Sequence, residues 1–223
     1  MKEIEELIKK TLKDIKNLYN NGIIDSKILF PKYADDDIRF SEQELKCIFL
    51  QKIETSGFYY SVETPSKYKY RFVDNDEPQV LFKDEKSNEK FQSSMIDMSL
   101  YKTKNQEDLI SHVEFKHGQC PIFPIQKDFL KLICESDKVK NNYFVHYLDN
   151  ADNGTKRAIL NKYKTSLNNI LNVNENIKNI KEKLEKVYVY VLFAGLKADE
   201  NFFCFSLGTL MNTEIDKILG EYI

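Results

Sequence analysis

The sequence predicts a mixed α/β domain, in which helices flank a central sheet. Apolar periodicity alternates along the chain between the helical and the strand pattern, in the order helix, strands, helix, strand, helix, strands, helix. The 223 residues are 42% hydrophobic, which is enough to bury a substantial core. Only 7 glycines and 5 prolines occur and no internal repeat is present, so we expect one domain over residues 1–223 without long flexible linkers.

The N-terminal part, residues 1–25, is predicted to be an amphipathic helix. Its apolar stripe begins at Ile4 and repeats with helical spacing, and Gly22 follows as a stop signal. We expect this helix to pack on the body of the protein. A dimerising helix is the alternative, which leaves a homodimer open.

Residues 150–223 are predicted to form a helix at Thr155–Asn172, a strand pair at Val187–Leu192 and Phe202–Leu207, and a final helix at Thr213–Leu219. The first of these helices has a basic flank, and Lys178–Lys186 continues basic but mixed with Glu. These are the best candidates for a surface that contacts phosphates. Solvated helix charge is the commoner explanation. The flank consists of Lys156, Arg157, Lys162 and Lys164.

Overall charge and composition restrict the function classes. The formal net charge is −2, so a nucleic-acid partner would need a local basic surface. The chain has no apolar run near 18 residues and its first residues are charged, which predicts no membrane partner and a cytoplasmic location. The four cysteines are far apart without a CxxC pair, and we expect small buried thiols.

Three charged side chains stand out on two predicted strands, Ser94–Lys102 and Leu109–His117. Alternation along a strand places Glu114 and Lys116 side by side on one face, while Asp97 lies on the neighbouring strand. Two carboxylates supply hard oxygen ligands for Mg²⁺ or Mn²⁺, and a lysine beside them can hold a hydroxide or a phosphate. The alternative is a set of solvent-facing charges on an edge strand.

Asp97 followed by Glu114-Phe115-Lys116 resembles the signature of the PD-(D/E)xK nucleases, the restriction-endonuclease-like superfamily. The likeness covers about Ser41 to Asp149. It implies a restriction-endonuclease-like mixed central sheet flanked by helices, with residues 41–149 as the catalytic core. Ile96 is a departure, because the signature has proline there.

The resemblance implies roles for these residues in a phosphodiesterase that uses Mg²⁺ or Mn²⁺. Asp97 and Glu114 would bind the metal ion, and Lys116 would position or activate the attacking water. Glu44, on the helix before the strands, would complete the metal site, with Glu42 as a weaker second choice. Glu44 also ends a capping box that begins at Ser41, which gives it a sufficient local role.

The helix that follows the Glu114–Lys116 strand provides two candidates for substrate binding. In nucleases of this superfamily a Gln or Lys on that helix can reach the substrate, which here points to Gln126 and Lys127. A solvated helix face is the alternative for both residues.

The expected function is that of a metal-dependent nuclease. The resemblance favours DNA over RNA as substrate, because most of the superfamily cuts DNA, and it suggests a role in restriction, phage defence or mobile-element processing. Two other functions remain open on the sequence: a catalytically inactive nuclease-fold subunit that binds or scaffolds, and a nucleotide-sensing regulator.

Overall fold

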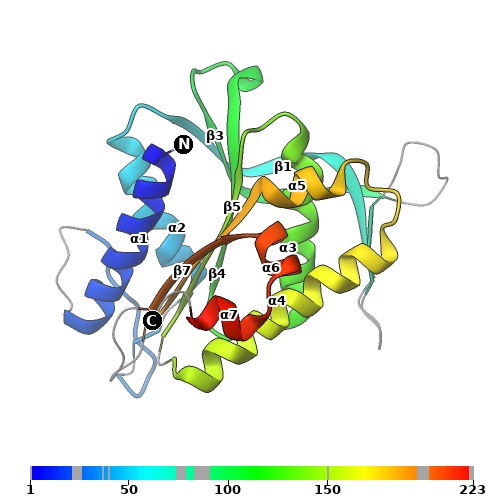
Figure 1. The fold of residues 1–223 in the computed structure, drawn as a ribbon. Coiled ribbons are helices and arrows are strands. Elements are labelled where there is room, and N and C mark those ends of the chain that lie inside the picture. The colour runs from blue at the N-terminus through cyan, green and yellow to red at the C-terminus, as the bar shows by residue number, and fades with distance from the viewer. Residues whose placement is uncertain are drawn as a thin grey trace.

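The computed structural model shows a seven-stranded mixed sheet with helices on both faces (Figure 1). It describes residues 2–21, 27–36, 38–39, 41–73, 79–82, 91–149, 151–194 and 201–220. The strands are β1 (Tyr59–Val73), β2 (Gln79–Phe82), β3 (Gln92–Tyr101), β4 (Leu109–His117), β5 (Asn142–Leu148), β6 (Val187–Phe193) and β7 (Asn201–Ser206). The helices are α1 (Lys2–Asn21), α2 (Glu42–Glu54), α3 (Ile122–Cys134), α4 (Asn153–Val173), α5 (Ile180–Glu185), α6 (Leu207–Asn212) and α7 (Ile215–Gly220).

The strand order is β2-β1-β3-β4-β5-β6-β7. The strands β1, β3 and β4 form an antiparallel meander, β4 through β6 run parallel, and β7 returns antiparallel to β6. The parallel strands need crossover connections, which α3 provides between β4 and β5, and α4 with α5 between β5 and β6. The mixed α/β class predicted from the sequence is confirmed.

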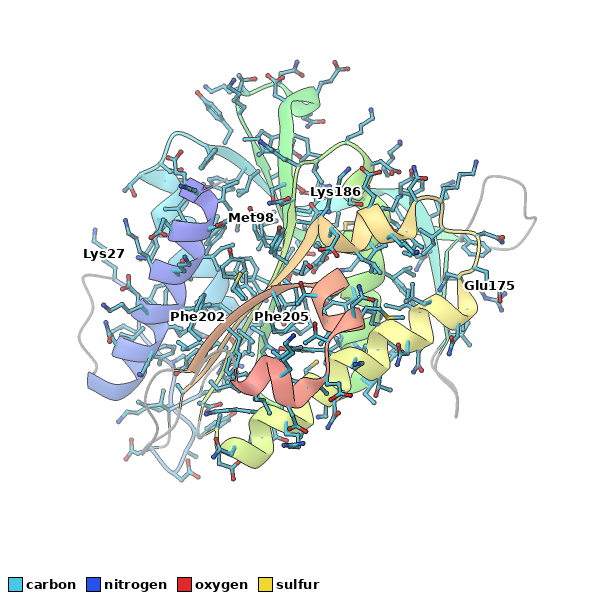
Figure 2. The ribbon with its side chains drawn as sticks, in the orientation of Figure 1. Lys27, Met98, Glu175, Lys186, Phe202 and Phe205 are labelled. Carbon is cyan, nitrogen blue, oxygen red and sulfur yellow. The ribbon has the colours of Figure 1, made fainter. Side chains whose placement is uncertain are left out.

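Each face of the sheet has its own hydrophobic core. On one face α1 and α2 cover side chains such as Phe115, and on the other α3 and α4 cover side chains such as Phe144. Strand β7 contributes to both by alternation, since Phe202 and Phe205 point to opposite sides (Figure 2). The helix α1 packs on the body of the protein through its predicted stripe, with Ile8 fully buried; the predicted stop signal, Gly22, lies outside the described residues.

The C-terminal part follows the expected order with shifted boundaries. Strand β7 ends at Ser206 rather than Leu207, because the Ser206 hydroxyl accepts from the N–H of Thr209 and starts the short helix α6. The final helix begins at Ile215. No helix in the described part of the chain has the length and apolarity that a membrane crossing requires.

The four cysteines are free thiols, but they do not share the buried environment expected from the sequence. Cys134 is buried, whereas Cys47 is exposed and Cys120 and Cys204 are intermediate. Cys47 lies on α2 between the buried positions Leu45 and Ile48, so its place in an apolar segment did not determine its orientation.

Candidate active site

Asp97 lies where β3 and β4 stop pairing. The antiparallel register between the two strands runs from Tyr101–Leu109 to Met98–Val113. One step further, the main-chain N–H of Phe115 donates to Asp97 Oδ2 at 2.8 Å. The Asp97 side chain therefore satisfies a backbone donor at the point where the two strands separate.

Glu114 and Lys116 project from β4 toward α3. Their neighbours Val113 and Phe115 belong to the core under α1 and α2, so alternation sends Glu114 and Lys116 to the other face. Glu114 is only 1% exposed. Its Oε1 lies 2.5 Å from Lys131 Nζ, on α3.

Lys116 joins helices from opposite faces of the sheet. Its Nζ lies 2.7 Å from Asp128 Oδ2 on α3 and 3.2 Å from Glu42 Oε2 on α2. It also donates to the carbonyl of Phe115 at 2.9 Å. This reach to both faces is possible because β3 no longer pairs with β4 at this level.

The helix α2 contributes a further lysine. Lys46 Nζ lies 2.8 Å from Asp97 Oδ1 and 3.1 Å from Glu42 Oε1, so Glu42 is shared between Lys46 and Lys116. Four acids and three lysines thus meet where the strands separate, and we call them the charge cluster. Its members are Glu42, Lys46, Asp97, Glu114, Lys116, Asp128 and Lys131.

The electrostatics of the charge cluster keep its lysines charged. Burial lowers the pKa of Lys116, but the charges of Asp128 and Glu42 outweigh it, so the pKa of Lys116 lies above its ordinary value. In the same way, Asp128 and Glu114 outweigh burial and raise the pKa of Lys131. All three cluster lysines, Lys46 included, have raised pKa values and remain ammonium groups at neutral pH.

The two buried carboxyl groups of the charge cluster differ in pKa. Burial and the neighbouring charge of Asp128 raise the pKa of Glu114 well above its usual range, against the opposing effect of Lys131. Burial also acts to raise the pKa of Asp128, but Lys131 and Lys116 together lower it. The difference arises because Asp128 contacts two ammonium groups and Glu114 contacts one.

The donor set has the right chemistry for a hard cation, because Asp97 and Glu114 provide carboxylate oxygens. Each acid of the charge cluster nevertheless has a lysine ammonium within 3.2 Å. Among the residues described, no three His, Cys, Asp or Glu side chains are grouped as a ready metal site. A divalent ion could therefore bind these carboxylates only in place of ammonium groups.

Glu44, the predicted third ligand, lies at the start of α2. Its Oε2 accepts from the N–H of Ser41 at 2.8 Å, and the Ser41 hydroxyl also donates to it. These bonds form the predicted capping box. The structure thus gives Glu44 the capping role, and it is Glu42, the second choice from the sequence, that belongs to the charge cluster.

The structure does not bring Gln126 or Lys127 into the charge cluster. Gln126 is 1% exposed and lies about 140–160° around the axis of α3 from Asp128 and Lys131. Lys127 Nζ is 4.8 Å from the centre of the Phe72 ring, so it is directed toward β1. Substrate binding by these two residues has no geometric support.

The basic flank predicted on α4 is engaged within the protein. Arg157 forms an ion pair with Asp216, Lys162 donates to the carbonyl of Cys120, and Lys164 donates to the carbonyl of Thr213. Lys156 is buried to 6% exposure. Arg157 and Lys164 thus hold the C-terminal elements against α4, and Lys162 holds the connection before α3. These contacts weaken the case for a phosphate-contacting surface on α4.

His146 lies beside the charge cluster, because it is the register partner of Lys116 on the neighbouring strand β5. His146 bridges the Tyr163 hydroxyl and the Gly118 carbonyl, at 2.5 and 2.7 Å. Burial lowers its pKa to about 3, so it is neutral and structural.

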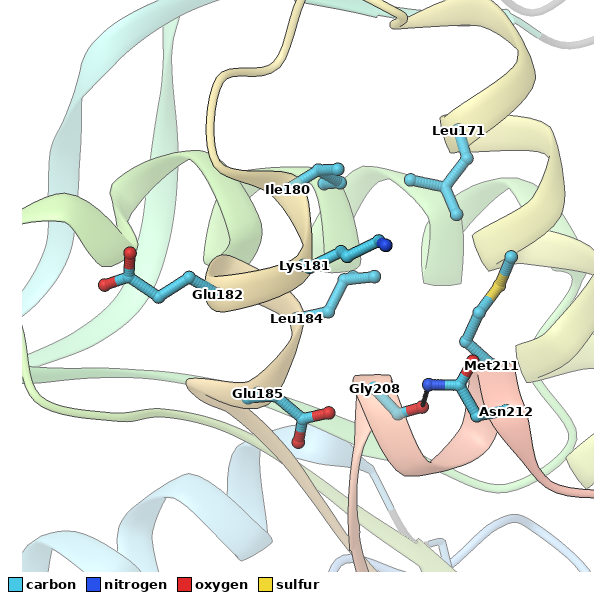
Figure 3. A pocket seen from close by; sticks show the side chains of 9 residues that line it. All are labelled: Leu171, Ile180, Lys181, Glu182, Leu184, Glu185, Gly208, Met211 and Asn212. Carbon is cyan, nitrogen blue, oxygen red and sulfur yellow. Dashed lines mark hydrogen bonds between the residues drawn. The ribbon is translucent and has the colours of Figure 1, made fainter.

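A pocket of about 550 Å³ lies between α4, α5 and α6 (Figure 3). Its lining contains none of the charge cluster; it consists of Leu171, Ile180, Lys181, Glu182, Leu184, Glu185, Gly208, Met211 and Asn212.

Sequence reasoning missed Lys46, Asp128 and Lys131. Lys46 follows Glu42 by four residues and Lys131 follows Asp128 by three, spacings that place each pair on one helix face. Such pairs are common on solvated helices, so only the packing of α2 and α3 against β4 distinguishes them.

The chain was compared with known protein families, curated proteins and solved structures, and no significant match was found.

Proposed function

We propose that the protein is a metal-dependent phosphodiesterase that hydrolyses nucleic acid, with the charge cluster as its active site. The observation that supports this most strongly is the convergence of Asp97, Glu114 and Lys116 at the separation of β3 and β4. This arrangement agrees with the sequence resemblance to the PD-(D/E)xK nucleases. Asp97 and Glu114 would hold Mg²⁺ or Mn²⁺.

A bound Mg²⁺ would supply an activated water and neutralise charge that develops on the phosphate. The residues of the chain determine what else is available. Lys116 is held by Asp128 and by the Phe115 carbonyl, and its raised pKa keeps it protonated. It is therefore suited to stabilise an anion, either the attacking hydroxide or the phosphate, rather than to accept a proton.

DNA is the proposed substrate, and this choice rests on the resemblance. The net charge of −2 gives no general attraction to phosphates. Recognition would therefore depend on cations of the charge cluster, such as Lys46, which contacts Asp97, and Lys116, which contacts Glu42. A role in restriction or phage defence is the biological setting that we propose for such an activity.

A second candidate function is a nuclease-fold subunit that binds or scaffolds without cutting. The observation that favours it is that every acid of the charge cluster already contacts a lysine ammonium and that Glu114 is only 1% exposed. A network of this kind can be purely structural.

Incubation of the wild-type protein with plasmid DNA, single-stranded DNA and RNA, in Mg²⁺, Mn²⁺ or EDTA, separates the two functions. We expect cleavage of DNA that requires the metal ion and that disappears in Lys116→Met. Lys127→Met is the matched control, because this lysine lies on α3 outside the charge cluster, and it should cut like the wild type. Binding of DNA without cutting under every metal condition would support the scaffold instead.

A further inference from the structure

The Lys131 ammonium occupies a site formed by three oxygen atoms. Its Nζ lies 2.5 Å from Glu114 Oε1, 2.9 Å from Asp128 Oδ1 and 2.9 Å from the carbonyl oxygen of Met95. The lysine side chain is 6% exposed and that of Glu114 1%. The three oxygen atoms come from β3, β4 and α3, so the packing of these elements positions them around the ammonium.

Two carboxylates and one carbonyl are hard oxygen donors, the type that divalent cations such as Mg²⁺ and Mn²⁺ accept. Here a monovalent ammonium on a flexible side chain occupies the position next to Glu114. Asp128 lies one turn before Lys131 on the same helix, at i and i+3, and its other oxygen contacts Lys116. Lys131 can therefore leave Glu114 and keep Asp128 as a partner.

We propose that Lys131 is a built-in counter-cation that a divalent metal ion must displace from Glu114 before the charge cluster can act. This inference rests on the proposed function, since it takes Glu114 as a metal-binding carboxylate. In this structure the Lys131 ammonium contacts the Glu114 carboxyl group, which would otherwise be buried without a cation beside it. A metal ion bound at Glu114 would displace the ammonium from the Glu114 oxygen and the Met95 carbonyl toward the solvent.

Competition between the ammonium and the metal ion lowers the apparent metal affinity of the wild-type protein. Removal of the ammonium should therefore raise that affinity, by a factor within the about 5- to 150-fold range typical of coupled binding equilibria. The same competition predicts that Lys131 becomes accessible to solvent when metal is bound.

The first test measures Mn²⁺ binding by calorimetry in wild type, Lys131→Met and Lys127→Met. We expect Lys131→Met to bind Mn²⁺ at least about fivefold more tightly than the wild type, and the control to match the wild type. Equal affinity in Lys131→Met and wild type, or no binding in either, overturns the proposal.

The second test uses the wild-type protein alone and so does not depend on the folding of a variant. Lysines are acylated briefly in the presence and absence of Mn²⁺, and the labelled sites are measured by mass spectrometry. We expect acylation of Lys131 to increase severalfold with Mn²⁺ while that of Lys127 stays constant. Labelling of Lys131 that does not change at saturating Mn²⁺ contradicts the displacement.

Cleavage measured on the same samples separates this inference from the proposed function. DNA cutting by a wild type whose Lys131 stays shielded at saturating Mn²⁺ refutes the displacement and leaves the nuclease in place. Tighter Mn²⁺ binding by Lys131→Met, with no cutting by any of the proteins, supports the displacement and refutes the nuclease.

Discussion

Replacement of Lys116 by methionine should abolish cutting at a modest cost in stability. The substitution removes an ammonium with contacts to Asp128 and Glu42. Neither acid loses its last cation, because Asp128 keeps Lys131 at 2.9 Å and Glu42 keeps Lys46 at 3.1 Å. We therefore expect the free energy of unfolding to fall by about 1–3 kcal/mol, the cost of hydrogen bonds lost around a charged group.

The matched substitution Lys131→Met should destabilise the protein more. It leaves Glu114, which is 1% exposed, without its ammonium contact. Loss of one partner of a buried ion pair costs about 3–5 kcal/mol. The structure thus predicts that Lys131→Met is the less stable variant, although the two substitutions are chemically identical and both lysines contact Asp128.

Urea unfolding at pH 7 gives the two free energies, and cleavage of plasmid DNA with Mg²⁺ gives the activities. The expected result is a folded, inactive Lys116→Met protein that is about 2 kcal/mol more stable than Lys131→Met. A Lys116→Met protein that is the less stable of the two would refute the ion-pair assignment. A Lys116→Met protein that cuts at the wild-type rate would refute the role of this lysine.

Three further predictions concern residues at and around the charge cluster. Glu44→Ala should lower the free energy of unfolding by about 1 kcal/mol, because the capping box is lost, and should leave cutting intact. Glu42→Gln should instead reduce cutting. Urea unfolding curves and DNA cleavage rates of the two variants test both expectations. Lys127→Met removes a cation–π contact with Phe72. In the same unfolding assay its free energy of unfolding should therefore fall by no more than about 1 kcal/mol. Burial lowers the pKa of His112 to about 4. As the pH falls from 6.5 to about 4, the free energy of unfolding of the wild type should therefore decrease by about 1.4 kcal/mol per pH unit more than that of His112→Gln. Parallel pH profiles of unfolding for these two proteins would contradict the buried neutral histidine.

The sign of the last prediction follows from proton binding. The unfolded chain takes up a proton on His112 near pH 6.5, whereas the folded protein resists it until about pH 4. Stability from the neutral histidine is therefore present above pH 6.5 and is lost as the pH falls through this window. Ser99, whose hydroxyl lies 2.8 Å from His112 Nδ1, can also hydrogen-bond to the glutamine.

Local sequence patterns predicted the longer elements of the fold. The capping box at Ser41, the stripe from Ile4 and the alternation around Glu114 all act within a few residues, and each appears as expected. The short helices α5 and α6 were not foreseen, because their six residues show little apolar periodicity, although the equally short α7 was expected.

The composition of the site was only partly predictable. Asp97, Glu114 and Lys116 lie on adjacent strands, where alternation and register bring side chains together. Asp128 and Lys131 arrive from a helix packed across the sheet, and no local rule fixes which helix face meets β4. For the same reason the sequence did not show that Gln126 is buried on another side of α3, outside the charge cluster.

The most direct test of the active-site assignment is the cleavage rate of Asp97→Asn. Asparagine keeps the oxygen that accepts from the Phe115 N–H and removes the negative charge that contacts Lys46. Asp152→Asn, at the exposed N-cap of α4, is the matched control. We predict that Asp97→Asn unfolds at a urea concentration close to that of the wild type but cuts DNA at least about a hundredfold more slowly, while the control cuts normally. A folded Asp97→Asn protein that cuts as fast as the control would show that the active site lies elsewhere.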